Sequence, residues 1–184
     1  CRAWRVLCGV QRGREASDPE AVGKLGGGRR SKGRGCAVMV AGAAAAGRAC
    51  HVDKAGQGAL EATKRAIVLR RKRAEARCAA GLADNLPELG VMLPCTPVQH
   101  LLLHDFAEAL RAQQGDSALP MLVMTSGNLH NEPIVTDDDQ ALVKFAGIAD
   151  AVLGNDRRIL SRYDDSVLRV VRVGDEQAIQ FVRR

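Results

Sequence analysis

The sequence predicts an α/β protein built on one twisted sheet that is mostly covered by flanking helices. Two observations lead to this prediction. Short apolar runs with little polar alternation recur along the chain, as in strands that are buried on both faces. Between them lie segments whose apolar residues recur at helical spacing. The length of 184 residues fits one domain that can bury a sizeable core.

The predicted strands are short aliphatic runs that end at Gly, Pro or polar clusters. Pro94 and Pro97 end the third of them, and the Gly174-Asp175 dipeptide favours a tight turn between the last two. The last two strands therefore form a hairpin. The predicted strands are Cys36–Val40, Ala66–Leu69, Leu89–Leu93, Pro120–Met124, Ala151–Leu153, Ser166–Val171 and Ala178–Val182.

The predicted helices carry clear start signals. Asp18 is a suitable N-cap for a helix that begins with Pro19 and Glu20, and Thr96 caps the strongest helix, Val98–Gln113. Apolar side chains recur along one face of that strongest helix. Two shorter helices are predicted at Gly56–Thr63 and Asp138–Phe145.

Composition excludes several classes of protein. Only 3% of the residues are aromatic, too few for a single-strand nucleic-acid binder that stacks bases on exposed rings. The longest apolar stretch, Cys36–Gly47, has 12 residues and is too short to cross a bilayer. No signal peptide is visible, which predicts a cytoplasmic protein with no membrane partner. Because the chain starts at Cys1 rather than Met, we expect it to be a piece of a longer protein.

The cysteines do not predict a zinc or other metal site. They form no CxxC pair and have no zinc-ligand spacing, so reduced and partly buried thiols are expected. The cysteines are Cys1, Cys8, Cys36, Cys50, Cys78 and Cys95.

Charge is distributed unevenly along the chain. Residues 1–73 contain 17 basic and 5 acidic residues, and residues 74–184 contain 10 basic and 16 acidic residues. Much of the basic excess lies in the clusters 29–34 and Lys64–Arg73. Such clusters attract polyanions, either nucleic acid or nucleotide phosphates. Solvated surface charge is an equally good interpretation of each cluster taken alone.

Three segments carry candidate site residues. Thr125-Ser126-Gly127-Asn128 follows a buried strand, where small polar residues can approach an anionic ligand. An Arg-rich loop that contains Arg157 and Arg162 leads into Asp164-Asp165-Ser166, which could bind phosphate and metal. His100 lies in the first turn of the strongest helix, and an imidazole is a side chain that can transfer protons. Each segment alone also fits a structural turn or a surface ion pair.

Taken together, these segments resemble the YrdC-like domain of HypF-type carbamoyltransferases, which take part in the maturation of [NiFe] hydrogenases. The best match spans residues 64–172, within a partial domain over 17–184, and we recognise no motif of the family in residues 1–16. The matching stretches are Ala66–Arg71, Leu89–Pro97, His100–Leu103, Leu122–Asn128, Glu132–Ile134, Ile148–Asp150, Asp156-Arg157 and Asp164–Val167.

The resemblance implies a sheet with a concave basic face that binds ATP, with Mg²⁺, and a carbamoyl group. It implies that carbamoyl-adenylate forms there and that pyrophosphate is released. In complete family proteins another domain supplies carbamate from carbamoyl phosphate, and a C-terminal domain passes the carbamoyl group to the C-terminal cysteine of a maturation partner. None of these further domains is expected within this chain.

The resemblance also implies roles for individual residues. Ser126 and Asn128 correspond to a Ser-x-Asn motif that acts on the reacting groups. Arg29 and Ser31, or one residue later Arg30 and Lys32, stand where the wider family has Lys-x-Arg. Thr125, Arg157, Arg162 and Ser166 would contact the nucleotide or the carbamoyl group. His100, Asp164 and Asp165 are further candidates.

This chain differs from the family pattern at several positions, and two alternative functions stay open. Asn155 stands where the family usually has His, and Cys95 stands where it usually has an aromatic residue. One alternative is a non-catalytic module that binds double-stranded RNA or tRNA through the two basic clusters, or else a degraded fragment. The other is a threonylcarbamoyl-adenylate synthase, although Leu93–Pro97 and Asp164–Val167 favour the HypF type.

Overall fold

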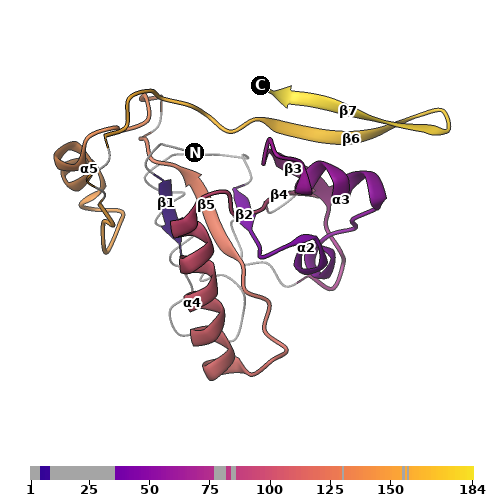
Figure 1. Ribbon diagram of the computed structural model, residues 1–184, viewed down its shortest axis with the longest axis horizontal. Helices are drawn as coiled ribbons and strands as arrows, with labels where there is room; N and C mark the ends of the chain where they lie inside the picture. The colour runs from indigo at the N-terminus through magenta and orange to yellow at the C-terminus, as the bar shows by residue number, and fades with distance from the viewer. Residues whose placement is uncertain are drawn as a thin grey trace.

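A computed structural model describes residues 5–8, 36–76, 82–83, 86–129, 131–154, 156 and 158–184. In this part of the chain seven strands form a single sheet in the order β1-β5-β2-β4-β3-β6-β7 (Figure 1). The strands are β1 Arg5–Cys8, β2 Ala37–Met39, β3 Ile67–Arg71, β4 Glu88–Met92, β5 Leu122–Ser126, β6 Val167–Val173 and β7 Glu176–Arg183.

The register of the central strands determines where β5 ends. β2 runs parallel to β4 and antiparallel to β5, and Ala37 pairs with Met124. On its other side β5 pairs with β1, where Ser126 lies opposite Arg5. The turn that follows β5 therefore lies at the edge of the sheet where the chain enters β2.

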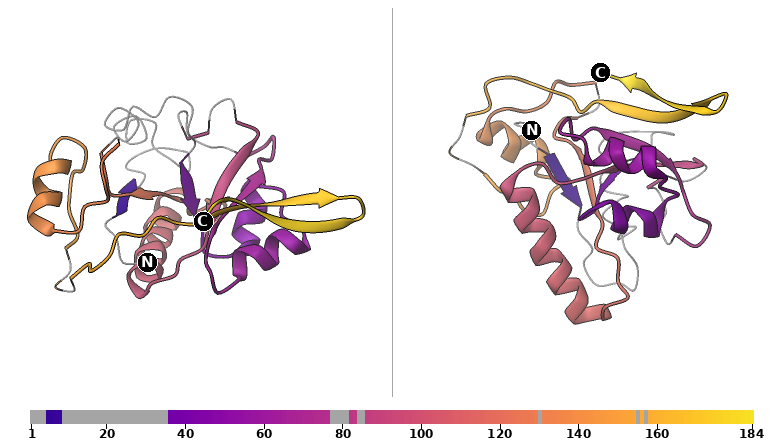
Figure 2. Two further views of the ribbon diagram at one scale, coloured as in Figure 1. Left: turned by 90° about the horizontal axis from the view of Figure 1, so that it is seen from above. Right: turned by 45° about the vertical axis from the view of Figure 1, so that its right-hand side comes forward.

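Helices cover both faces of the central strands (Figure 2). On one face, α2 (Ala43–Ala49) and α3 (Lys54–Glu61) contribute small and aliphatic side chains to the largest apolar cluster, which includes Val68, Val91 and Val123. On the opposite face, α4 (Pro97–Gln114) packs against a second cluster. The members of that cluster are Met39, Met92, Leu103, Leu122 and Met124. Side chains along a strand point alternately to the two faces of the sheet, so neighbouring residues of each strand belong to different clusters.

α5 (Asp138–Phe145) and the β6–β7 hairpin lie apart from the central strands. α5 lies outside the sheet, and its Phe145 packs with Val135 in a small cluster of its own. At the other end the β6–β7 hairpin projects from the body, and all residues of β7 are exposed. Arg169 of β6 reaches across β3 to make a two-pronged ion pair with Glu88 of β4. The expected covering of the sheet thus holds for its central strands and does not extend to β7.

Most of the predicted elements are confirmed. The helix Asp138–Phe145 has the predicted bounds, and the strongest predicted helix forms with its N-cap, since Thr96 Oγ1 accepts a hydrogen bond from the Gln99 backbone N–H. The hairpin turns at Gly174, whose φ of +63° suits glycine in a two-residue turn. The predicted helix at Asp18 lies outside the described residues.

The structure corrects the prediction in three places. Ala151–Leu153 is irregular rather than a strand, because Val152 packs beneath α5 while Leu153 is 69% exposed and pairs with no strand. α2 was not predicted, although its alanines favour a helix. β1 was not predicted either, because the segment is short and its described partner strand, β5, lies far away in the sequence. No helix in the described part of the chain is both long and apolar enough to span a bilayer.

Candidate functional site

The turn after β5 places Ser126 on the face of the sheet that α4 covers. Leu122 and Met124 pack against α4, and side chains two residues apart on a strand point to the same face, so Ser126 continues that row. Thr125 is half-buried between them and points to the opposite face. The backbone of the turn is held by Val135, whose N–H donates to the Gly127 carbonyl at 2.8 Å.

The side chain of Asn128 closes this turn. Its Nδ2 lies 3.0 Å from the carbonyl oxygens of both Leu129 and Glu132, and its Oδ1 lies 2.6 Å from Ser126 Oγ. Asn131, with a φ of +60°, reverses the chain within the same loop, a conformation that asparagine tolerates. Ser126 and Asn128, which the sequence singled out together, are therefore hydrogen-bonded to each other.

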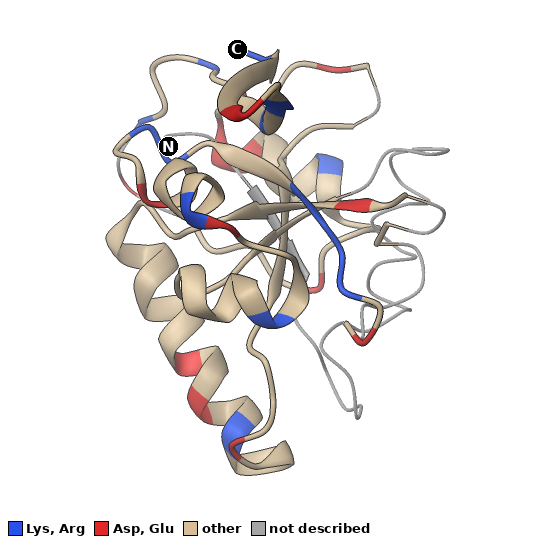
Figure 3. Ribbon diagram, turned by 90° about the vertical axis from the view of Figure 1, so that its right-hand side faces the viewer, with Lys and Arg blue, Asp and Glu red and all other residues tan. Residues whose placement is uncertain are grey.

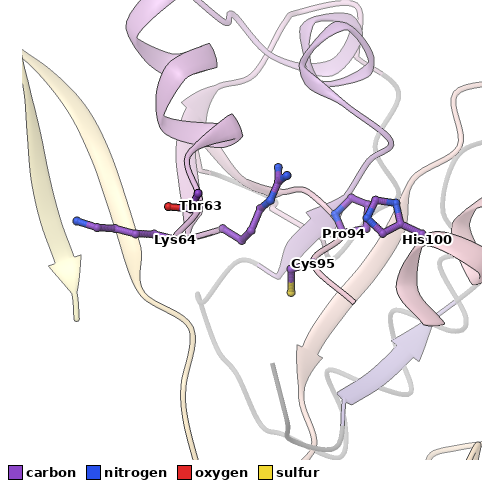
Figure 4. A pocket seen from close by; sticks show the side chains of 6 residues that line it. Thr63, Lys64, Pro94, Cys95 and His100 are labelled. Carbon is purple, nitrogen blue, oxygen red and sulfur yellow. The ribbon is translucent and has the colours of Figure 1, made fainter. Parts of the chain in front are cut away.

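A pocket of about 430 Å³ opens on the same face (Figure 4). Thr63, Lys64 and Arg65 line it from the loop between α3 and β3. Pro94 and Cys95 line it from the connection between β4 and α4, and His100 from the first turn of α4. Lys64 and Arg65 bring two positive charges to this pocket, and with the N-terminal end of a helix they make it attractive to an anion. The Lys64 side chain extends away from Cys95 and His100 (Figure 4), and its Nζ lies 5.8 Å from the centroid of the Phe181 ring of β7.

The walls of the pocket are held by local hydrogen bonds. Gln99 is 6% exposed, and its Oε1 accepts from the Cys95 backbone N–H at 2.9 Å and from Cys95 Sγ at 3.3 Å. On the opposite wall Arg65 adopts a φ of +45°, which is rare for a residue with a side chain, and its N–H donates to the Ala62 carbonyl. Local hydrogen bonds thus hold the backbone of both pocket walls in place.

The pocket and the Ser126 turn adjoin each other. The first turn of α4, which carries His100, lies beside the end of β5 (Figure 1), and His100 and Cys95 line the pocket. Ile67, two residues after Arg65, packs in the same apolar cluster as Met124, two residues before Ser126. The face of the sheet that α4 covers, here called the α4 face, therefore carries one polar region. Hydroxyl and amide groups lie at one end of this region and cations at the other.

Two of the other predicted site residues border this region. Arg162 Nε donates to the Ile134 carbonyl at 2.7 Å, next to Val135, which holds the Ser126 turn. The Ser166 carbonyl accepts from the Ile67 N–H at 2.9 Å, which places the start of β6 beside the start of β3. The chain segment 162–166 thus runs from the turn towards the pocket.

Asp164 and Asp165 face the hairpin instead. Asp164 forms an ion pair with Arg183 at 3.6 Å, and the Asp165 carbonyl accepts two hydrogen bonds from the same guanidinium. Across the described residues no group of three or more His, Cys, Asp or Glu side chains is arranged to hold a metal ion. Arg29, Ser31 and Arg157, together with the alternatives Arg30 and Lys32, lie outside the described residues.

The basic cluster Lys64–Arg73 is divided by the fold. Lys64 and Arg65 line the pocket, whereas Arg70, Lys72 and Arg73 donate to the carbonyls of His51, Ala83 and Gly47. The segment Arg70–Arg73 is the longest run of basic residues along the described ribbon (Figure 3). Because three of its four side chains are used internally, neutralising it would disturb the fold and would not isolate a contribution to RNA binding.

The pocket residues cannot be recognised as a group from the sequence. Lys64 and Arg65 belong there to one basic cluster with Arg70–Arg73. Cys95 was noted as a departure from the family pattern, and Gln99 was not singled out. The Thr96-Pro97 helix start was a usable signal, because it fixes which residues occupy the first turn of α4.

Comparison with known proteins gives a consistent result. The family described as "Telomere recombination" (Sua5/YciO/YrdC) matches residues 13–184. Carbamoyltransferase HypF2 of Cupriavidus necator is 41% identical over 190 residues, which cover 99% of this chain and 23% of that protein.

Two solved structures are also similar. One is full-length HypF in its phosphate- and nucleotide-bound form, with a TM-score of 0.76, 36% identity, and coverage of 92% of this chain and 24% of that one. The other is HypF of T. kodakarensis, with a TM-score of 0.78, 26% identity, and coverage of 96% and 21%. The chain thus spans less than a quarter of the length of these relatives. The resemblance to the YrdC-like region of HypF is confirmed, and the expected boundary near residue 17 stays a prediction.

Proposed function

Because this chain belongs to the Sua5/YciO/YrdC family, we propose that its α4 face binds ATP and carbamate and joins them as carbamoyl-adenylate. The observation that carries the proposal is the position of the Ser126–Asn128 turn beside a pocket lined by Lys64, Arg65 and His100. The similarity to a HypF structure that holds phosphate and nucleotide supports an anion-binding role for this face.

The proposed reaction needs positioning and charge neutralisation more than acid–base chemistry. A carboxylate oxygen of carbamate attacks the α-phosphorus of ATP, the bond from that phosphorus to the bridging oxygen breaks, and pyrophosphate leaves. The attacking oxygen is already deprotonated, so no general base is required. The main obstacle is repulsion between two anions, which Lys64, Arg65 and the N-terminal end of α4 would offset.

The remaining candidates have supporting roles in this proposal. Arg162 and Ser166 lie between the turn and the pocket and would contact the triphosphate, as would Arg29, Ser31 and Arg157. Thr125 was expected to contact the ligand as well, but its side chain points to the opposite face of the sheet, so it has no contact in this proposal. His100 would add a hydrogen bond at the pocket wall. No described residue is assigned to Mg²⁺, since this ion is commonly held largely by substrate phosphates and water.

The proposed place of this reaction is carbamoyl transfer in [NiFe] hydrogenase maturation. The relatives at 36–41% identity are HypF proteins, and the chain corresponds to less than a quarter of each. Supply of carbamate and transfer of the carbamoyl group to the C-terminal cysteine of a partner would be carried out by other parts of such a protein.

Lys64→Gln tests the role of the pocket. We expect the dissociation constant for Mg-ATP, measured by titration calorimetry, to rise roughly 10- to 100-fold, because a charge-assisted contact to phosphate contributes roughly 1.5–3 kcal/mol. The melting temperature should fall by no more than about 4 °C, because Lys64 is exposed and loses only a surface cation–π contact with Phe181, which contributes about 0.5–1 kcal/mol.

Lys54→Gln is the matched control. Lys54 is also an exposed lysine but lies at the start of α3, outside the pocket, so its removal should leave ATP binding unchanged. Equal ATP affinity in the wild type and in Lys64→Gln would contradict the proposed nucleotide site, as would an equal loss in both variants.

A further inference from the structure

The side chain of Lys64 connects the pocket with the β6–β7 hairpin. Lys64 is one of the residues that line the pocket, but its side chain extends towards the hairpin, where Nζ lies 5.8 Å from the centroid of the Phe181 ring (Figure 4). An ammonium group within about 6 Å of a ring centroid is attracted by the negative face of the aromatic system. The charge of Lys64 is therefore held at the hairpin and not inside the pocket.

Strand pairing places Phe181 beside the loop that carries Lys64. Phe181 of β7 pairs with Leu168 of β6, and Leu168 pairs with Val68 at the start of β3, directly after that loop. Phe181 is 37% exposed, the lowest value among the large apolar side chains of β7. The ring is thus anchored against β6 while one part of it stays open to a cation.

A bulge in β7 lies next to the ring. Val167 of β6 pairs with Arg183 of β7. The next residue of β6, Leu168, pairs with Phe181, which leaves Val182 as an extra residue in β7. A bulge bends the strand that contains it and redirects the side chains beside it. The direction of the Phe181 ring therefore depends on this irregularity of the pairing.

The same ring also attracts a second cation. Arg184 Cζ lies 5.0 Å from the centroid of the Phe181 ring. Because like charges repel, two cations at one ring hold each other less firmly than either would be held alone. If Lys64 left the ring, Arg184 would still occupy it. The arrangement therefore makes the departure of Lys64 less costly.

We propose that Phe181 is a positioning residue that holds Lys64 away from the pocket and competes for it with a bound anion. This inference rests on the proposed function, in which Lys64 contacts phosphate. The lysine stem is flexible, so Nζ can leave the ring and reach a phosphate oxygen when a triphosphate enters the pocket. Breaking the cation–π contact then reduces the net binding free energy, and the nucleotide binds less tightly than it would without Phe181.

Phe181→Leu tests the competition. Leucine keeps an apolar side chain opposite Leu168 but has no aromatic ring, so Lys64 is released. The dissociation constant for Mg-ATP, measured by titration calorimetry with the full chain, should fall about two- to fivefold, the change that corresponds to one surface cation–π contact. Phe181→Tyr keeps a ring and should bind Mg-ATP like the wild type. Ile179→Leu, two residues away in β7, is the matched control and should leave the dissociation constant unchanged.

The same substitution in the Lys64→Gln background shows whether the effect acts through Lys64. Without the lysine, Phe181→Leu should change the dissociation constant by less than about 1.5-fold, because the two residues are coupled. An equal gain in both backgrounds would overturn the inference, since the ring would then act through another group such as Arg184. An unchanged or weakened affinity in Phe181→Leu alone would also overturn it.

Proton NMR of the chain labelled with ¹³C-lysine observes the contact directly. The chain has six lysines, and the loss of one signal in Lys64→Gln identifies Lys64. In the free wild type the ring current of Phe181 should shift the Lys64 Cε protons upfield, and both Phe181→Leu and saturating Mg-ATP should remove that shift. No upfield shift in the free protein, or one that persists at saturation, would overturn the inference and leave the proposed function standing. Failure of the folded chain to bind Mg-ATP would overturn both.

Discussion

Gly56→Ala is expected to destabilise the protein by about 2–3 kcal/mol, a drop in melting temperature of roughly 5–10 °C. A Cβ at this position in α3 would lie 2.8 Å from Arg70 Cζ and 2.8 Å from Asp53 Oδ1. The Arg70 guanidinium cannot move aside cheaply, because it is buried and donates to the His51 carbonyl at 3.0 Å. The added methyl group would therefore separate a buried charge from its partner. Thermal and urea unfolding measure the effect.

Gly58→Ala is the control within the same helix. No atom lies within 4 Å of the position where its Cβ would be built. Alanine favours a helix over glycine by about 0.8–1 kcal/mol, so this variant should melt a few degrees higher than the wild type. If both variants shift the melting temperature in the same direction, Gly56 does not make the close approach to Arg70 that the structure shows.

Asp53→Ala is expected to cost about 2 kcal/mol at pH 7. Asp53 Oδ1 accepts the Gly56 N–H at 2.7 Å as the N-cap of α3 and lies 3.1 Å from Arg70, and Oδ2 accepts from Gln177 of β7. The loss of an N-cap costs about 1 kcal/mol, and a hydrogen bond to a charged group contributes a comparable amount at this half-exposed position. Urea unfolding measures the difference from the wild type.

The cost of Asp53→Ala should depend on pH. Burial acts to raise the pKa of Asp53, but the Gly56 N–H and the Arg70 guanidinium outweigh it and lower the pKa below its ordinary value of 3.8. Because the pKa of Asp53 is lower in the folded than in the unfolded protein, its carboxylate contributes its full stabilisation at pH values above the ordinary pKa of 3.8. This contribution is lost as the pH falls through the folded pKa.

The difference in stability between wild type and Asp53→Ala should therefore be constant from pH 7 to about pH 5 and narrow below pH 4. Asp53→Asn separates the two contributions, because asparagine is an equally good N-cap without charge. It should cost less than Asp53→Ala at pH 7. If the difference in stability between the wild type and Asp53→Ala does not change between pH 7 and pH 3, the charge of Asp53 contributes nothing to the stability of the fold.

Local signals predicted the elements that frame the site. Thr96 and Pro97 set the start of α4, and Gly174 the turn of the hairpin, because capping and turn preferences depend on residues a few positions apart. The prediction was wrong at Ala151–Leu153, where three apolar residues suggested a strand. A strand requires a partner, and this segment lies beside α5 rather than beside the sheet.

Charge patterning was a poor guide to the surface. Lys64–Arg73 reads as one basic cluster, yet its members separate into pocket-lining and internally bonded side chains. The strand period explains part of this, since neighbouring residues of β3 point to opposite faces. The rest depends on which carbonyl groups lie nearby, and those belong to segments far away in the sequence.

The sequence by itself determined the order of the central strands and helices, the Ser-Gly-Asn turn and its likeness to one family. These depend on apolar periodicity, turn residues and motif order, all of which are local along the chain. Tertiary structure alone decided that Ser126 donates to Asn128, that the pocket adjoins their turn, and that Gly56 touches Arg70. A hydrogen-bond direction or a close contact is set by partners that only the folded chain brings within reach.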